Sequence, residues 1–122
     1  MSAGPTQCFE QVGVWHKVHT WVLSMYRMTE RFPKHETYGI SSQLRRAAVS
    51  VPANFAEGYK KRGRADKAWF MNIAQGSVEE CRYYLILRRD LGSAETRQAL
   101  EDLDEVSRML DAYHRRLLSP VS

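Results

Sequence analysis

Four long segments of the sequence carry apolar residues at every third or fourth position, and this spacing constrains the fold more than any other feature. Such spacing gathers apolar side chains on one face of an α-helix, which must then be buried against a neighbour. No stretch alternates apolar and polar residues as a half-buried strand does. The expected helices cover residues 15–32, 41–58, 64–90 and 100–117. We therefore expect an all-α protein, an antiparallel up-down-up-down four-helix bundle over residues 9–118 with short tails at residues 1–8 and 119–122.

Two prolines and a glycine punctuate the first half of this pattern. Pro33 is expected to end the first helix, because the residue before a proline is pushed out of helical geometry. Pro52 lies inside the second segment and has no N–H, which predicts a kink, or a break followed by a restart capped by Ser50. Gly58 is expected to end the second helix.

The third segment has apolar residues on more than one side. One stripe consists of Phe70, Ile73, Ala74, Ser77, Cys81, Tyr84 and Leu87. Further apolar residues lie off it, at Trp69, Met71, Val78, Tyr83, Leu85 and Ile86. A helix with two apolar sides buries two sides, and in a chain of 122 residues the second side predicts a subunit interface.

Positive charge is concentrated in one short stretch. The chain has a formal net charge of +4, and residues 60–67 alone hold five basic side chains against one acidic side chain. The basic residues are Lys60, Lys61, Arg62, Arg64 and Lys67. Such a local excess attracts phosphate groups, although a solvated loop that only keeps a protein soluble has the same composition.

Residue patterns that would carry catalysis or hold a metal are missing from the sequence. The paired Glu-x-x-His repeats of di-iron bundles do not occur, and the nearest match is the single pair Asp111 and His114. His16 and His19 are three residues apart, with no carboxylate placed to complete a metal site. There is no Gly-x-Ser-x-Gly elbow, phosphate loop or dinucleotide fingerprint. We therefore expect a protein that is not an enzyme and has no metal or cofactor.

The cysteines and the hydropathy pattern predict a cytoplasmic protein. No apolar run is long enough for a membrane span, and the first residues lack the features of a signal peptide. Cys8 lies in the expected N-terminal tail, and Cys81 lies on an apolar stripe, where we expect an inert buried thiol.

One acidic residue falls at the edge of a predicted core. Glu80 borders the apolar stripe of the third helix, and Arg45 and Arg46 border that of the second. A carboxylate near a core needs a cationic partner or becomes neutral. We therefore expect Glu80 to pair with Arg45 or Arg46, fixing the register of the two helices.

The sequence from Tyr38 to Gly58, YGISSQLRRAAVSVPANFAEG, resembles the signature of the four-helix-bundle proteins encoded in intervening sequences of bacterial 23S rRNA genes. The stretches Val12–Trp15 with Lys17, Arg31–Lys34 and Gln75–Glu80 resemble flanking features of that family, while the aromatic content of the third helix is not dictated by it. The resemblance implies a cyclic homopentamer without known enzymatic activity. The family is similar to the accessory proteins of diversity-generating retroelements, basic pentamers that associate with RNA and reverse transcriptase.

The motif residues carried over by the resemblance are Arg45, Arg46, Asn54, Glu57, Gly58 and Glu80. Asn54 and Glu57 are candidates to satisfy backbone groups at the Pro52 kink. Two functions remain open. In the first, a ring binds RNA, or DNA, through the residues of 60–67, with Tyr59 or Trp69 stacking on a base. In the second, the ring is a protein-interaction scaffold and the basic residues only aid solubility.

Overall fold

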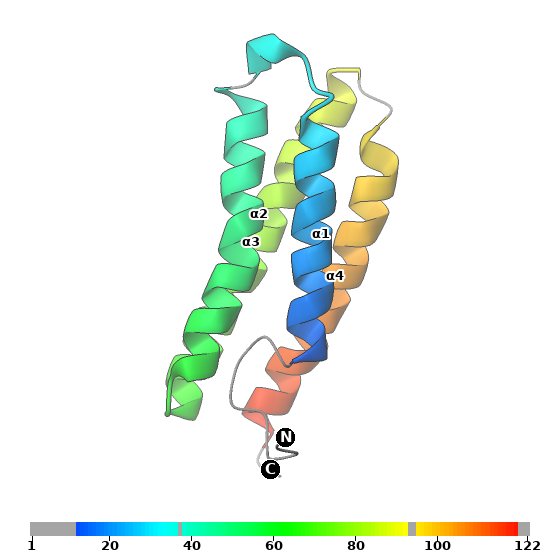
Figure 1. The fold of residues 1–122 in the computed structure, drawn as a ribbon. Coiled ribbons are helices and arrows are strands. Elements are labelled where there is room, and N and C mark those ends of the chain that lie inside the picture. The colour runs from blue at the N-terminus through cyan, green and yellow to red at the C-terminus, as the bar shows by residue number, and fades with distance from the viewer. Residues whose placement is uncertain (1–11, 37, 93–94, 120–122) are drawn as a thin grey trace, which may run out of the picture.

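The computed structural model describes residues 12–36, 38–92 and 95–119, and every regular element in this part of the chain is helical. In Figure 1, α1 lies in front, between α2 and α4, with α3 behind them. The elements are α1 (Gly13–Thr29), the 3₁₀ turn η2 (Lys34–Glu36), α2 (Ile40–Lys60), α3 (Arg64–Asp90) and α4 (Thr96–Leu118). The expected all-α bundle of four helices is confirmed. None of these helices is long and apolar enough to cross a membrane.

Helix α1 ends four residues before Pro33, earlier than predicted. The Thr29 hydroxyl donates to the carbonyl of Met25 at 2.9 Å and lies 3.1 Å from that of Tyr26. A threonine that bonds back to its own helix competes with the backbone and favours a helix end. The next residues form a tighter turn, in which the N–H of Phe32 bonds to the Thr29 carbonyl at 3.1 Å. The Phe32 side chain then folds into the core, where it is 6% exposed.

Helix α2 continues through Pro52 without interruption, so of the two expected alternatives, a kink or a break with a restart, the break is wrong. Proline leaves the Ala48 carbonyl without its helical donor. The helix survives because Leu44, Val51 and Phe55, before and after the proline, are all fully buried in the same core. Helical stability in proteins comes mostly from such packing of an apolar face.

The core stripe of α3 is rotated from the predicted one. The buried residues of this helix are Met71, Ala74, Ser77, Val78, Cys81 and Leu85. Three of these were expected off the stripe, whereas Ile73, expected on it, is 38% exposed. The rotation arises because α3 packs against both α2 and α4, so its buried face points between them. Trp69 and Tyr83 stay 64% and 59% exposed.

A buried ion pair fixes the turn between α1 and α2. Arg88, in the last turn of α3, donates to Glu36 of η2 at 2.9 Å, and both side chains are nearly inaccessible to solvent. The Arg88 guanidinium also lies over the Phe32 ring, 5.3 Å from its centroid. Breaking one partner of such a pair leaves a buried charge, so the pair holds η2 against the end of α3.

Candidate nucleic-acid interface

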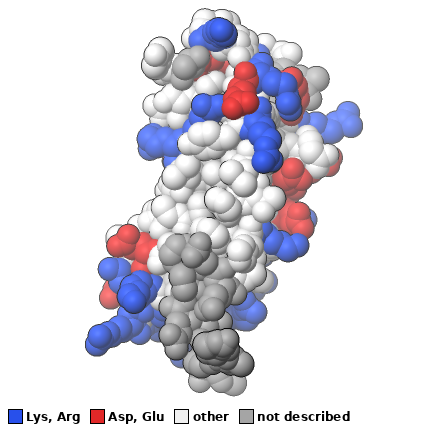
Figure 2. Space-filling model, viewed as in Figure 1, with Lys and Arg blue, Asp and Glu red and all other residues white. Residues whose placement is uncertain are grey.

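The basic residues of 60–67 lie at the end of the bundle where α2 passes into α3. The connection is short, because α2 ends at Lys60 and α3 begins at Arg64. Figure 2 shows Lys and Arg side chains with acidic neighbours at both ends of one face, this end included, and a largely uncharged middle between them. The predicted end of the second helix at Gly58 is therefore wrong by two residues.

Lys67 turns out to be a structural residue of this connection. Its ammonium group donates to the carbonyl of Tyr59 at 2.7 Å and lies 5.3 Å from the centroid of the Tyr59 ring. The Tyr59 carbonyl belongs to the last turn of α2, where a cation complements the helix dipole. Lys67 therefore ties the first turns of α3 to the end of α2, and Tyr59 is half-buried beneath it.

Two further basic residues of the cluster have partners within the chain. Lys61 lies 3.8 Å from the carboxylate of Glu57 and 5.2 Å from the centroid of the Phe70 ring. Arg64 is exposed, and its guanidinium donates to the Ser119 carbonyl at 3.0 Å. Both charges still contribute to the local field, because neither is deeply buried.

Lys60 and Arg62 are exposed, and neither has a partner among the described residues. They flank Lys61 at the tip of the connection. Trp69, 64% exposed, follows in the second turn of α3. The structure thus brings two unpaired cations and one accessible indole ring to the same end of the bundle, which is the combination that holds phosphates and stacks on unpaired bases.

Arg45 and Arg46 have different roles. Arg45 reaches back to the end of α1, where its Nε donates to the Thr29 hydroxyl at 2.6 Å and its Nη2 to the Tyr26 carbonyl at 3.1 Å. Its guanidinium also lies over the Tyr26 ring. Arg46 is the residue that pairs with Glu80, at 3.4 Å, and this pair stands on the surface with side chains 64% and 42% exposed. The predicted pairing is correct, but its predicted burial is wrong.

The remaining motif residues lie along the contact between α2 and α3. The Asn54 amide donates to the carbonyl and hydroxyl of Ser50 at 2.8 and 2.9 Å, so it satisfies groups in the turn before Pro52. Glu57 is exposed and pairs with Lys61 instead of with the backbone. Gly58 is buried against α3, where an added Cβ would stand 2.8 Å from the Cβ of Phe70. Its role is close helix packing.

Two kinds of reactive group can be examined in the described residues, a cysteine thiol and a metal-binding cluster. Cys81 is fully buried, and burial, with a smaller contribution from the Glu80 carboxylate, raises the pKa of its thiol to about 12. Such a thiol stays protonated and unreactive at neutral pH, as predicted. No group of three or more His, Cys, Asp or Glu side chains in the described part of the chain is placed to hold a metal ion. Cys8 lies outside the described residues.

The fold and these motif positions agree with a known family. A family model described as the 23S rRNA-intervening sequence protein matches residues 10–112. The chain belongs to this family. The resemblance carried by residues 38–58 is therefore confirmed.

A solved structure shows the same fold. It is a crystal structure of a protein of unknown function from the S23 ribosomal protein family of Bacteroides thetaiotaomicron. The two chains share 23% identity with a TM-score of 0.74, over 84% of this chain and 95% of the other. No curated protein matches the sequence.

Proposed function

We propose that this member of the 23S rRNA-intervening sequence protein family is a non-catalytic cyclic homo-oligomer, a pentamer, that binds RNA or a ribonucleoprotein. The observation that carries the proposal is the pair of exposed cations Lys60 and Arg62, which have no partner among the described residues and lie at the same end of the bundle as the exposed Trp69. Cyclic symmetry places this end of every subunit at the same level along the ring axis, so residues 60–67 of all subunits form one basic rim.

Within the rim, the five predicted residues take unequal shares. Lys60 and Arg62 make the main phosphate contacts, while Lys61 and Arg64 contribute through the local field. Lys67 donates to the Tyr59 carbonyl and holds the connection that carries the other four basic residues. One subunit makes only two or three phosphate contacts and binds a nucleic-acid strand weakly. A strand that spans several subunits makes these contacts several times over and gains avidity. Nothing in the rim reads base edges, so binding is sequence-tolerant.

A ring needs two different contact surfaces on each subunit, because the contact between neighbours is head-to-tail. The chain offers exposed apolar side chains on separate elements. Leu23 of α1 and Val49 of α2 are each 41% exposed, and Ile73 and Tyr83 of α3 are 38% and 59% exposed. In the proposed ring, Leu23 and Val49 of one subunit pack against Ile73 and Tyr83 of its neighbour. The predicted use of α3 as an interface is retained in this form.

Binding of a fluorescently labelled single-stranded RNA, measured by anisotropy across a range of salt concentrations, tests the proposal. The variant Lys60→Gln/Arg62→Gln removes the two unpartnered charges. Arg97→Gln/Arg108→Gln is the matched control, because it removes two exposed charges from α4. We expect the rim variant to lose about tenfold or more in affinity and to flatten the salt dependence, and the control to stay within about twofold of wild type.

Equal losses in the two variants would show that only net charge matters and would contradict the assignment of the rim. An absence of RNA binding by the wild-type protein at low salt would favour the second function, a protein-interaction scaffold. The exposure of Trp69 is the observation that supports that alternative, because exposed aromatic side chains are common at protein interfaces.

A further inference from the structure

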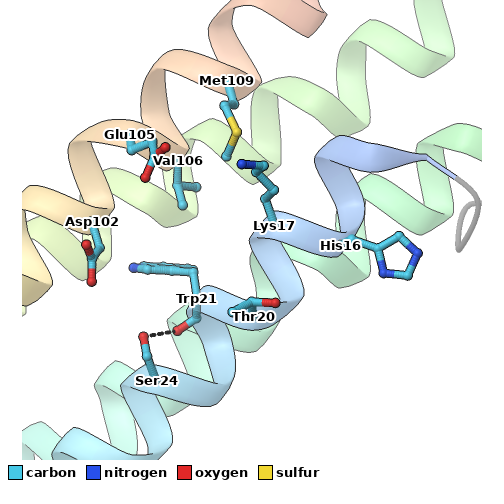
Figure 3. Close-up of a pocket in the computed structure, with 9 residues that line it drawn as sticks. All are labelled: His16, Lys17, Thr20, Trp21, Ser24, Asp102, Glu105, Val106 and Met109. Carbon is cyan, nitrogen blue, oxygen red and sulfur yellow. Dashed lines mark hydrogen bonds between the residues drawn. The ribbon is translucent and has the colours of Figure 1, made fainter.

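A groove of about 460 Å³ runs between α1 and α4, away from the basic rim. Its apolar lining comes from Val106 and Met109 of α4 and from the Trp21 ring of α1, as Figure 3 shows. Its polar lining includes Lys17 of α1 and the carboxylates Asp102 and Glu105 of α4. A groove of this size and mixed lining suits a small organic molecule.

The Trp21 side chain has an unsatisfied donor at this groove. Trp21 is only 4% exposed, and its indole nitrogen is buried without a hydrogen-bond partner among residues 12–36, 38–92 and 95–119. Figure 3 shows the indole between the two helices, with this nitrogen directed toward Asp102. The Ser24 hydroxyl, which also lines the groove, donates to the Trp21 carbonyl at 2.7 Å. A buried donor without an acceptor is costly, and an acceptor that enters beside Asp102, with a small shift of that side chain to uncover the buried nitrogen, would remove that cost.

The wall opposite the indole carries negative charge. Asp102 and Glu105 are three residues apart on α4, which places both on one side of the helix. One oxygen of Asp102 accepts from Gln98 at 2.9 Å, whereas Glu105 has no partner among the described residues. In a chain whose net charge is +4, this wall is a local excess of negative charge. Such a wall attracts a cation.

We propose that the groove between α1 and α4 binds a small organic cation, an ammonium or guanidinium group carried on an apolar body that also bears a hydrogen-bond acceptor. The cation lies against Asp102 and Glu105, the apolar body packs on Val106 and Met109, and the acceptor takes the Trp21 N–H. Lys17, on the other wall, opposes the cation by like-charge repulsion and limits its affinity.

Tyramine is a suitable probe, because it carries an ammonium group, an aromatic ring and a hydroxyl. The matched control, 4-ethylphenol, lacks only the ammonium group. A ligand of this size is expected to bind with a Kd on the order of 1 mM. The readout is the indole N–H cross-peak of Trp21 in a heteronuclear NMR spectrum, assigned by its disappearance in the variant Trp21→Phe.

We expect tyramine to shift the Trp21 cross-peak saturably, and 4-ethylphenol to bind at least about tenfold more weakly. Asp102→Asn/Glu105→Gln should weaken tyramine binding by about tenfold, while Glu101→Gln, an exposed acid outside the groove, should leave it unchanged. Lys17→Gln should tighten binding by a few-fold, which a purely structural role would not produce.

Two results would overturn the proposal. One is an equal response to tyramine and 4-ethylphenol, which would show non-specific apolar binding. The other is a Trp21 cross-peak of the wild-type protein that does not move when tyramine is added, although the rest of the spectrum is that of the folded protein. That result would mean that tyramine does not bind in the groove. Neither result depends on RNA binding, so the proposed function is tested separately.

Discussion

The contact between α2 and α3 and the contact between α1 and α4 differ in the size of the side chains that meet there. Between α2 and α3, Gly58 leaves no room for a Cβ against Phe70, and the hydroxyls of Ser50 and Ser77 are 2.8 Å apart. Between α1 and α4, the bulky Trp21 leaves a groove of about 460 Å³, and its buried N–H has no acceptor in the part of the chain that the structure describes. Small residues let two backbones approach closely, whereas large ones must fill the space that they create.

The largest effect that this difference predicts is at Gly58. Gly58→Val should destabilise the fold by about 2–3 kcal/mol, because the new side chain meets the Cβ of Phe70, which cannot move aside alone. Gly76→Val is the matched control in α3, since nothing lies within 4 Å of an added Cβ there. Denaturant unfolding of both variants measures the difference, and equal stabilities would mean that α2 and α3 are not in close contact.

The second prediction concerns Cys81, in the core beside this contact. Its thiol pKa rises from 9.0 to about 12 on folding. The contribution of this thiol to the free energy of unfolding is fully present below pH 9 and is lost as the pH rises toward about 12. In that range the thiol is deprotonated in the unfolded chain but still protonated in the folded one. Between pH 8 and pH 10.5 the wild-type protein should lose about 2 kcal/mol more stability than Cys81→Ala. Urea titrations at the two pH values check this, and parallel losses would mean that water reaches the thiol.

A smaller effect is expected for the hydroxyl pair that bridges α2 and α3. Ser50→Ala and Ser77→Ala each leave one hydroxyl with fewer partners, so each should cost about 1 kcal/mol. Because the two atoms share one hydrogen bond, the double variant should cost less than the sum of the single ones. A double-mutant cycle measures this coupling, and strict additivity would rule out the bond as a link between the helices.

The smallest effect is expected for the surface pair Arg46–Glu80. Its side chains are 64% and 42% exposed, and exposed pairs contribute about 0–1 kcal/mol. Arg46→Gln or Glu80→Gln should therefore change the midpoint of thermal unfolding only slightly, and less at high salt. A loss as large as that of Gly58→Val would show that the pair is buried in solution.

The sequence predicted that α2 and α3 are linked by an ion pair better than it predicted the details of that link. The pairing of Glu80 with Arg45 or Arg46 followed because these residues border the apolar stripes of the two helices, but the spacing did not show that Arg46 is the partner and that Arg45 reaches α1 instead. Its exposure did not follow, because burial depends on how far each helix is rotated. The same unknown rotation misplaced the core stripe of α3, whose buried face is set by its packing against both α2 and α4.

The candidate rim was predicted as a cluster but not as separate roles. Lys67 reaches the Tyr59 carbonyl only because α2 continues past Gly58. The sequence placed the helix end at Gly58, because glycine often ends helices, whereas here it allows close packing. The Trp21 groove and the Glu36–Arg88 pair join residues far apart in the chain, so no local spacing predicted them.

Light-scattering mass of the purified protein tests the central claim, that a ring of identical subunits repeats the basic rim. The account predicts five times the mass of one chain, a further increase when single-stranded RNA is added, and a smaller particle for Tyr83→Lys. A mass equal to one chain across the accessible concentration range, with or without RNA, would contradict it.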